Sequence, residues 1–282
     1  MFTCKEYRKV KTLEEAWELN QKRSNQLIGG MLWVKMGQRS VQTVIDLSDL
    51  GLDQIEETEE EFSIGCMATL RQLELHEGLN VYTQGAVRES VRHIVGVQFR
   101  NLATVGGSIF GRFGFSDVLT MFLAMDTYVE LYKGGVVPLA RFVEMKRDRD
   151  ILVRVIVKKG NGRFAYQSMR NTKTDFPVLA VAVSAAGDRL RISVGARPAR
   201  AMLLTVSSEK ICDAAAEVCR AAGQILSGEG TEDDAVLIGA YVSQSVPTGS
   251  NLRGSAQYRS HLVQVLVKRA CLETGGKAAE QR

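Results

Sequence analysis

Two pairs of adjacent glycines are the residues of this sequence that could do chemistry. Gln26–Leu27–Ile28 leads into Gly29–Gly30, and Ala103–Thr104–Val105 leads into Gly106–Gly107 and Ser108. Because glycine has no Cβ, consecutive backbone amides can point into one concavity and a ligand can approach them closely. Such a nest suits phosphate oxygens, and two nests suit a pyrophosphate. A β-bulge or a tight turn is the alternative at each pair.

An acidic residue, Asp117, follows the second glycine pair. At this spacing its carboxylate can accept hydrogen bonds from sugar or ribityl hydroxyls, as in other dinucleotide-binding folds. It can equally be a carboxylate at a helix N-terminus, where the helix dipole favours it. A third pair, Gly134–Gly135, has no Ser or Thr beside it and indicates a plain turn. The lysine of a P-loop is absent, which favours a tightly held dinucleotide over a transferred phosphoryl group.

The remaining reactive residues form no catalytic or metal-binding pattern. The three histidines have no HExxH spacing, and the sequence contains no GxSxG, Walker A or kinase signature. The cysteines have no CxxC spacing, which argues against disulfides, zinc or an iron–sulfur cluster within this chain. We therefore expect no catalytic side chains and no metal ligands, with any chemistry supplied by a bound cofactor. Buried, inert thiols are expected at Cys4, Cys66, Cys212, Cys219 and Cys271.

Composition excludes several function classes. The 282 residues are long enough for two domains, and 45% hydrophobic with 24% charged residues is typical of a globular protein. The net charge of +4 is spread along the chain, so nucleic acid is not an expected partner. No apolar run approaches the roughly 20 residues of a membrane span, and the N-terminus has no signal-peptide core. We expect a cytoplasmic protein that does not bind membranes.

Alternating strands and helices are expected to position the glycine pairs. Thr12 with Glu15 and Thr69 with Gln72 are capping-box patterns that start helices, the second ending near Gly78. The apolar run before each glycine pair indicates a short strand, resuming after Gly30. Further elements are expected as strands at 42–50, 61–70 and 127–132, and as helices at 84–95 and, capped by Ser116, at 117–126.

The second half of the sequence has a different texture. Long apolar runs at 151–157, 163–169, 177–186 and 190–196 predict antiparallel strands, the last two joined by a tight turn. Helices are expected at 207–223, 232–244 and 255–272, with Ser255 as a cap and a frayed tail after them. A mixed βα half followed by a smaller antiparallel sheet with helices is α+β in class.

Several segments, in this order, resemble a known family. They are "QLIGGMLWVKM", "IGCMATLRQLE", "FRNLATVGGSIFGRFGFSD", "ILVRVIV" and the closing "SNLRGSAQYRSHLVQVLVKRA". Together they resemble the FAD-binding (medium) subunit of molybdenum hydroxylases, the xanthine dehydrogenase and carbon monoxide dehydrogenase family. The resemblance implies a two-subdomain FAD-binding fold of the vanillyl-alcohol-oxidase type at 1–170, with subdomains at about 1–55 and 56–170. A C-terminal α+β domain at 171–282 would carry the small antiparallel sheet.

The resemblance also implies which residues bind FAD. The loop from Leu27 to Val34 would wrap the pyrophosphate, and Thr104 to Ser108 would lie against the pyrophosphate and the flavin. Asp117 and Ile94 would touch the cofactor, and Leu152 would flank the isoalloxazine. The expected cofactor-binding residues are Leu27, Ile28, Gly29, Gly30, Met31, Leu32, Trp33, Val34, Ile94, Thr104, Val105, Gly106, Gly107, Ser108, Asp117 and Leu152.

The sequence departs from the family pattern after the second glycine pair. Many relatives have "NASPxSD" where this chain has "FGRFGFSD". Phe113 or Phe115 could cover the flavin, with ordinary core packing as the alternative, and Arg112 could place positive charge near the reduced ring. Gln167, after Tyr166, stands where some relatives have lysine, so that contact is not carried over. Arg170 and Asp175 look like a structural pair.

The function that the resemblance implies is electron transfer. FAD in this chain would receive electrons from 2Fe-2S clusters in a partner subunit, while a molybdopterin-binding subunit of the same heteromeric complex oxidises the substrate. NAD⁺ is the expected acceptor, with oxygen, ferredoxin or a quinone as alternatives, and the substrate is left open. Two other functions remain: a free-standing flavin oxidase, and an assembly module that carries FAD or lacks it.

Overall fold

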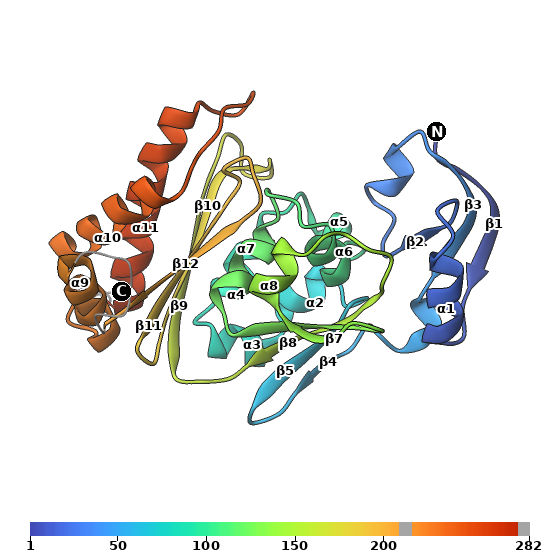
Figure 1. Ribbon diagram of the computed structural model, residues 1–282, viewed down its shortest axis with the longest axis horizontal. Helices are drawn as coiled ribbons and strands as arrows, with labels where there is room; N and C mark the ends of the chain where they lie inside the picture. The colour runs from blue at the N-terminus through green and yellow to red at the C-terminus, as the bar shows by residue number, and fades with distance from the viewer. Residues whose placement is uncertain (209–215, 276–282) are drawn as a thin grey trace. The chain divides into compact units, whose positions relative to one another are not determined.

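The computed structural model describes residues 1–208 and 216–275, which form two compact units (Figure 1). Unit 1 consists of Met1–Leu73, Val95–Gly111 and Thr127–Lys158. Unit 2 consists of Glu74–Ile94, Arg112–Asp126 and the described residues from Lys159 onward. Each unit is therefore built from separate stretches of sequence. The domain limits expected above, 1–170 and 171–282, stay predictions.

Unit 1 begins with a three-stranded parallel sheet in the order β1-β3-β2. Its middle strand is almost continuously buried from Val41 to Asp46, as expected for a parallel strand covered on both faces. A small apolar cluster of Ile28, Val41 and Val44 packs here. The elements of this part are β1 (Thr3–Lys9), α1 (Leu13–Asn20), β2 (Gln26–Ile28), the 3-10 helix η1 (Val34–Met36), β3 (Ser40–Asp46) and the 3-10 helix η2 (Ser48–Leu50).

A five-stranded antiparallel sheet, in the order β4-β5-β8-β6-β7, forms the rest of unit 1. Its central strand β8 pairs with β5 and with β6, and Val155 and Val157 on it are fully buried. The elements are β4 (Ile55–Glu57), β5 (Glu61–Gly65), α5 (Val97–Arg100), α6 (Val105–Phe110), β6 (Thr127–Leu131), β7 (Gly135–Pro138), α8 (Leu139–Glu144) and β8 (Leu152–Lys158). Helix α2 (Leu70–Leu75) leads from unit 1 into unit 2.

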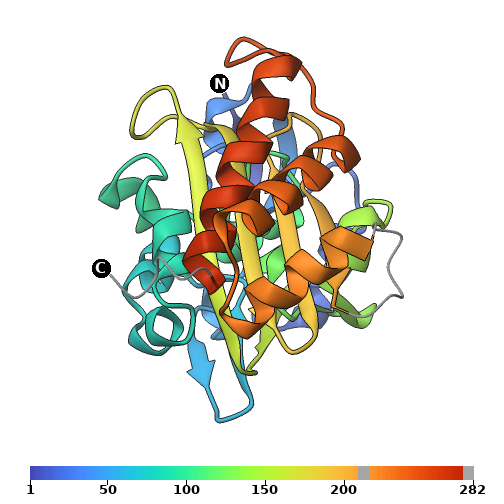
Figure 2. The same ribbon diagram turned by 90° about the vertical axis from the view of Figure 1, so that its left-hand side faces the viewer.

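Unit 2 is built around a four-stranded antiparallel sheet in the order β12-β11-β10-β9. The three C-terminal helices cover one face of this sheet (Figure 2), and α4 and α7 pack against its strands as well. Because β10 is covered on both sides, nearly all of its residues are buried. The elements are α3 (Glu77–Tyr82), α4 (Ala86–Arg92), α7 (Asp117–Ala124), β9 (Gly162–Arg170), β10 (Pro177–Ala186), β11 (Arg189–Gly195), β12 (Met202–Ser207), α9 (Ala216–Ser227), α10 (Glu232–Ser245) and α11 (Ala256–Gly275).

Several expected caps are present. Thr12 accepts a hydrogen bond from the Glu15 amide, and Ser116 accepts one from the Leu119 amide. Thr69 and Gln72 bond each other reciprocally, which is the capping box expected from their spacing. Side-chain oxygens at these positions satisfy amides that have no partner within the helix, so the sequence signal predicts the helix starts correctly. Ser255 likewise accepts from the Tyr258 amide at the start of α11.

Other expectations are wrong. The run from Leu102 to Val105 is not a strand: Thr104 caps α6, and both glycines of the second pair lie in its first turn. The buried side chains of Val105 and Ile109, at i and i+4, hold this short helix against the core. The helix from Thr69 ends before Gly78, which belongs to α3, and η1 follows Gly30 in place of a resumed strand. The helix expected at 207–223 is described from Ala216, since 209–215 lie outside the described residues, as does Cys212.

The closing signature has a structural explanation. Arg259 is 1% exposed, and its guanidinium donates to the carbonyls of Val178, Gly249 and Gly254 and to the Asn251 side chain. The arginine at the end of the "RGSAQYR" motif therefore fastens the loop before α11 onto β10. This motif supports the fold of unit 2.

Candidate functional site

Unit 1 contains a pocket of about 350 Å³ that gathers residues from both glycine segments. This volume lies in the range of small-molecule sites. The wall carries charges of both signs, because Arg23, Arg39 and Arg149 line it together with Asp148 and Asp150. Of the residues expected to bind FAD, the pocket is lined by Leu27, Ile28, Gly29, Val34, Thr104, Gly106, Gly107 and Leu152.

The two glycine segments are in direct contact, and this contact requires glycine. A Cβ on Gly29 would lie 2.5 Å from Oγ1 of Thr104, and a Cβ on Gly30 would overlap the carbonyl of Leu102. The close approach of the first loop to the residues before α6 therefore leaves no room for a side chain at either position. Structural packing alone accounts for the first glycine pair.

The amides of the first glycine segment are available for the expected nest. Among the described residues, the backbone amides of Gly29, Gly30, Met31 and Leu32 donate no hydrogen bond. Met31 has a φ of 58°, a left-handed conformation that is uncommon for a residue with a side chain. A left-handed residue within a run of unbonded amides produces a concavity suited to an anion. The binding of phosphate oxygens by this loop stays a prediction, which its unbonded amides are consistent with.

At the second glycine segment the expected nest is not formed. The amides of Val105 and Gly106 donate to the carbonyls of Ala68 and Cys66, each at 2.8 Å, and the Gly107 amide donates to Oγ1 of Thr104 at 3.1 Å. These bonds occupy the donors at the start of α6, so the interpretation as a second amide nest is wrong.

The two glycines of this second pair differ in their surroundings. A Cβ on Gly106 would meet the Cys66 carbonyl at 2.7 Å, whereas a Cβ on Gly107 would meet only Oγ1 of Thr104, at 3.1 Å. Gly107 is thus the glycine whose missing side chain leaves space that protein atoms do not fill.

Several expected site residues lie elsewhere. Gly30, Met31, Leu32, Trp33, Val105 and Ser108 belong to the same two segments but do not line the pocket. Trp33 is half exposed and packs edge-on against Phe99, with ring centroids 5.9 Å apart. Ile94 and Asp117 belong to unit 2. Their roles as cofactor contacts stay predictions.

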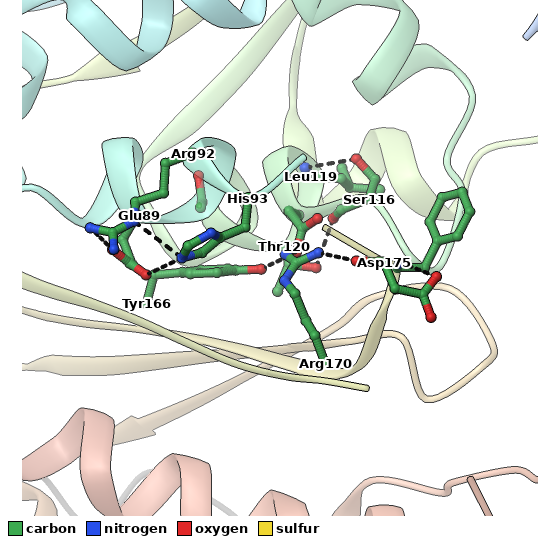
Figure 3. Close-up of polar contacts among 12 residues, drawn as sticks. Glu89, Arg92, His93, Ser116, Leu119, Thr120, Tyr166, Arg170 and Asp175 are labelled. Atoms are coloured by element: carbon green, nitrogen blue, oxygen red, sulfur yellow. Dashed lines mark hydrogen bonds and ion pairs between the residues drawn. The ribbon is translucent and has the colours of Figure 1, made fainter. Parts of the chain in front are cut away.

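Asp117 takes part in a buried polar cluster within unit 2, of which Figure 3 labels Tyr166 and Arg170. It is the first residue of α7 and only 5% exposed. Its Oδ1 accepts a hydrogen bond from the Tyr166 hydroxyl and pairs with the Arg170 guanidinium at 2.5 Å. Burial raises the pKa of Asp117 to about 6, although Arg170 and Tyr166 act in the opposite direction. Burial, together with the nearby Asp117 charge, also raises the pKa of Tyr166 well above its usual value.

Arg170 and Asp175, which were expected to form a structural pair, contact each other through the Asp175 backbone and not through its carboxylate. Arg170 donates to the backbone carbonyl of Asp175 at 2.7 Å, while the Asp175 carboxylate pairs with Arg253 at 2.9 Å. Arg170 and Asp175 are therefore in contact, as expected (Figure 3), but the ion pair of Arg170 is with Asp117. On α4, burial lowers the pKa of His93, whose Nε2 lies 3.5 Å from the Glu89 carboxylate.

The departures from the family pattern lie in unit 2 from Arg112 onward, while Phe110 and Gly111 belong to unit 1. Phe113 and Phe115 are 45% and 39% exposed and stack on each other at 5.2 Å, so the core-packing interpretation of these rings is wrong. Phe115 also meets the edge of Phe176. Gln167 donates to Glu273 of α11 at 2.6 Å, on the sheet face opposite to that of Tyr166.

The described part of the chain shows no metal site, no membrane-spanning helix and no reactive thiol at Cys66 or Cys271. Across residues 1–208 and 216–275, no group of His, Cys, Asp and Glu could hold a metal ion, and no helix is long and apolar enough to cross a membrane. Burial raises the pKa of the Cys66 and Cys271 thiols to about 12, which leaves them protonated and unreactive. Cys4 is exposed, contrary to expectation.

Most of the residues that line the pocket were not expected from the sequence. Arg149, Asn20 and Asn25 are among them, and the Arg149 guanidinium contacts the Asn20 side chain and the Asn25 carbonyl. The signal was weak, because Arg149 stands in the charged run "KRDRD", which resembles an ordinary solvated loop. Their 124-to-129-residue separation in sequence gives no local pattern.

Comparison with known proteins identifies the class. Residues 2–159 match the family described as the FAD-binding domain in molybdopterin dehydrogenase. The match spans more than half of the chain, and the protein belongs to this family. It is an FAD-binding flavoprotein component of an oxidoreductase, and its α+β fold with a C-terminal antiparallel sheet and helices is the one expected from the sequence.

Individual relatives agree in length and fold. The uncharacterized protein YgfM of Escherichia coli K12 is 24% identical over 261 residues, covering 91% of each chain. A chain of quinoline 2-oxidoreductase from Pseudomonas putida 86 superposes with a TM-score of 0.80 at 18% identity, covering 97% of each chain. A chain of carbon monoxide dehydrogenase from Hydrogenophaga pseudoflava gives 0.74 at 20% identity, covering 96% of each chain. At these identities the structural matches show the shared fold.

Proposed function

We propose that this chain is the FAD-binding electron-transfer subunit of a molybdenum hydroxylase of the xanthine dehydrogenase type. Electrons would arrive from 2Fe-2S clusters of a partner subunit, and the final acceptor would be NAD⁺. A separate molybdopterin-binding subunit would oxidise the substrate. The proposed complex is located in the cytoplasm.

One observation carries this proposal: the pocket of unit 1 fits a dinucleotide. On one side, Gly29 lines the pocket with an unbonded amide, and the unbonded amides of Gly30 to Leu32 follow it in the same loop as further donors suited to a pyrophosphate. On the other, the open position at Gly107 lets a ligand approach the backbone of α6. Arg23 and Arg39 in the wall are cations that can pair with phosphate oxygens, although Asp148 and Asp150 also line it. The residues present therefore fit FAD, with the first glycine loop and the start of α6 as its two supports.

The chain's own residues bind and orient the cofactor. FAD supplies the redox chemistry, since it can exchange single electrons with an iron–sulfur cluster and a hydride with a nicotinamide. Thr104 keeps the Gly107 amide fixed by its 3.1 Å hydrogen bond, which holds the first turn of α6 in place beside the pocket. Ile28 and Leu152 provide apolar parts of the wall. This arrangement requires no acid–base pair from the protein.

The comparisons support a complex with molybdenum chemistry. The matched family is named for molybdopterin dehydrogenases, and one solved relative is described as a carbon monoxide dehydrogenase that lacks the Mo-pyranopterin moiety of the molybdenum cofactor. In the described residues no metal-binding group occurs, so iron–sulfur and molybdenum centres belong to partner subunits in this proposal.

Reconstitution with FAD and then with the partner subunits tests the proposal. The purified chain should bind FAD and quench its fluorescence, and the complete complex should reduce NAD⁺ with electrons from its oxidised substrate. A chain that binds no FAD would contradict the flavoprotein proposal. FAD binding together with reduction of oxygen, ferredoxin or a quinone, and none of NAD⁺, would overturn only the acceptor. Turnover of small alcohols by the isolated chain would favour a free-standing oxidase.

A further inference from the structure

Arg149 joins two walls of the pocket through an unusual set of hydrogen bonds. Its Nε donates to the carbonyl of Asn20, and its Nη2 donates to the carbonyls of Lys22 and Asn25 at 3.0 and 3.1 Å. Nη2 also lies 3.3 Å from Oδ1 of Asn20, whose Nδ2 donates to the Arg149 carbonyl at 2.8 Å. A single guanidinium therefore binds the whole turn from Asn20 to Asn25.

This turn leads directly into the first glycine loop. Asn25 is followed by β2 and then by Gly29 and Gly30, whose amides face no partner within the described residues. Inside the turn, the backbone amide of Asn25 donates to the Lys22 carbonyl at 3.0 Å, and the side-chain Nδ2 of Asn25 donates to the Leu19 carbonyl at 2.9 Å. The position of the turn thus sets the point from which the loop starts.

On its other side, Arg149 is connected to α6. It precedes β8, in which the Val153 carbonyl accepts a hydrogen bond from the Cys66 amide at 2.9 Å. The Cys66 carbonyl in turn accepts from the Gly106 amide at 2.8 Å, in the first turn of α6. Backbone hydrogen bonds therefore link the strand that follows Arg149 to the helix that carries Gly107.

We propose that Arg149 is a positioning residue for FAD, which fixes the spacing between the first glycine loop and the start of α6. The inference rests on the proposed function, because it assumes that FAD occupies this pocket. Its effect comes from the planar fork of the guanidinium. Lysine has the same charge but cannot reach three carbonyls in this arrangement.

The main experiment compares Arg149→Lys with wild type and with Arg141→Lys. Arg141 is exposed on α8 of the same unit, so its substitution is a matched control. We expect Arg149→Lys to weaken FAD binding at least tenfold and to speed FAD dissociation, while Arg141→Lys leaves both unchanged. Binding is measured well below the melting temperature of each FAD-free protein, so that only folded protein is titrated.

The alternatives give different results. If Arg149 acts through its charge on the phosphates, Arg149→Lys keeps wild-type affinity, and the positioning role is overturned. If the residue is merely structural, the variant melts at a lower temperature but its folded fraction binds FAD normally, which also overturns it. Failure of wild type to bind FAD contradicts the proposed function itself.

A second variant keeps the proposal testable if Arg149→Lys does not fold. Asn20→Ala removes the Asn20 side-chain contacts with Arg149 and leaves the guanidinium in place. From Asn20→Ala alone we expect a smaller loss of FAD affinity, severalfold. Where Arg149→Lys does fold, the double variant should bind FAD no more weakly than Arg149→Lys. Wild-type affinity in Asn20→Ala, or fully additive losses in the double variant, would contradict the shared role.

Discussion

Gly107 and Asp117, which lie in one short segment of the sequence, have opposite surroundings: Gly107 faces a pocket, and Asp117 is bonded to protein side chains. Gly107 lines the pocket of unit 1, and a side chain there would meet only Oγ1 of Thr104. Asp117 in unit 2 is 5% exposed, and its carboxylate is bonded to Tyr166 and Arg170. The resemblance assigns both residues to the cofactor, yet only the first is placed at the pocket. Asp117 belongs to the other unit, so its role as a cofactor contact stays a prediction, like that of Gly107.

The largest expected effect separates the two neighbouring glycines. Gly106→Val should destabilise the fold by about 5 kcal/mol, the sum of an overpacked contact and a lost buried hydrogen bond. Its Cβ would lie 2.7 Å from the Cys66 carbonyl, which accepts the bond from the Gly106 amide. Urea unfolding of the FAD-free protein measures this loss. Wild-type stability in Gly106→Val would show that the start of α6 is not packed against Cys66 as described.

Gly107→Val should leave a folded protein that no longer retains FAD. The valine side chain would occupy the space beside the pocket, and we expect affinity to fall about a thousandfold, or about 4 kcal/mol. Equilibrium titration of flavin fluorescence measures the affinity, and circular dichroism reports the fold. Gly160→Val is the control, because a Cβ on Gly160 has no neighbour within 4 Å. Normal FAD binding by Gly107→Val would remove the start of α6 from the proposed site.

The sequence predicts the ends of many elements because those signals are local. Thr12, Thr69 and Ser116 stand next to the amides that they cap, so residue type and spacing are enough. Alternating apolar runs predict β9, β10 and β11 for the same reason. The strand β1 (Thr3–Lys9) was not expected, because it is exposed along its whole length and carries no apolar alternation.

The interior of the site could be predicted only in part. Glycine pairs indicate where backbone approaches closely, but they do not say whether a ligand or another part of the protein is the neighbour. For Gly30 the neighbour is the Leu102 carbonyl, and for Gly106 it is Cys66. Contacts such as Arg149 with Asn25 join residues 124 positions apart, for which no periodic pattern exists. The tertiary fold decides these pairings.

The smallest of the three expected effects is the pH dependence of stability that comes from Asp117. Because burial raises the pKa of Asp117 from 3.8 to about 6, the folded state binds a proton more tightly than the unfolded state between these values. Stability from this group is therefore present below about pH 4 and is lost as the pH rises through about 6. The loss amounts to about 3 kcal/mol for a shift of about two units. Denaturant unfolding at pH 4 and pH 7 measures it.

Asp117→Asn isolates the contribution of Asp117 ionisation to stability. The asparagine amide keeps an oxygen that accepts hydrogen bonds from Tyr166 and Arg170, but the amide does not titrate in this pH range. The difference in unfolding free energy between wild type and Asp117→Asn should therefore move against wild type as the pH rises from 4 to 7. If Arg170 outweighs burial, the carboxylate is ionised throughout and the difference stays constant or moves the other way. That result would make Asp117 a simple ion-pair partner. The expected result would instead show that burial determines the pKa of the Asp117 carboxyl, whereas Gly107 lies at an open position.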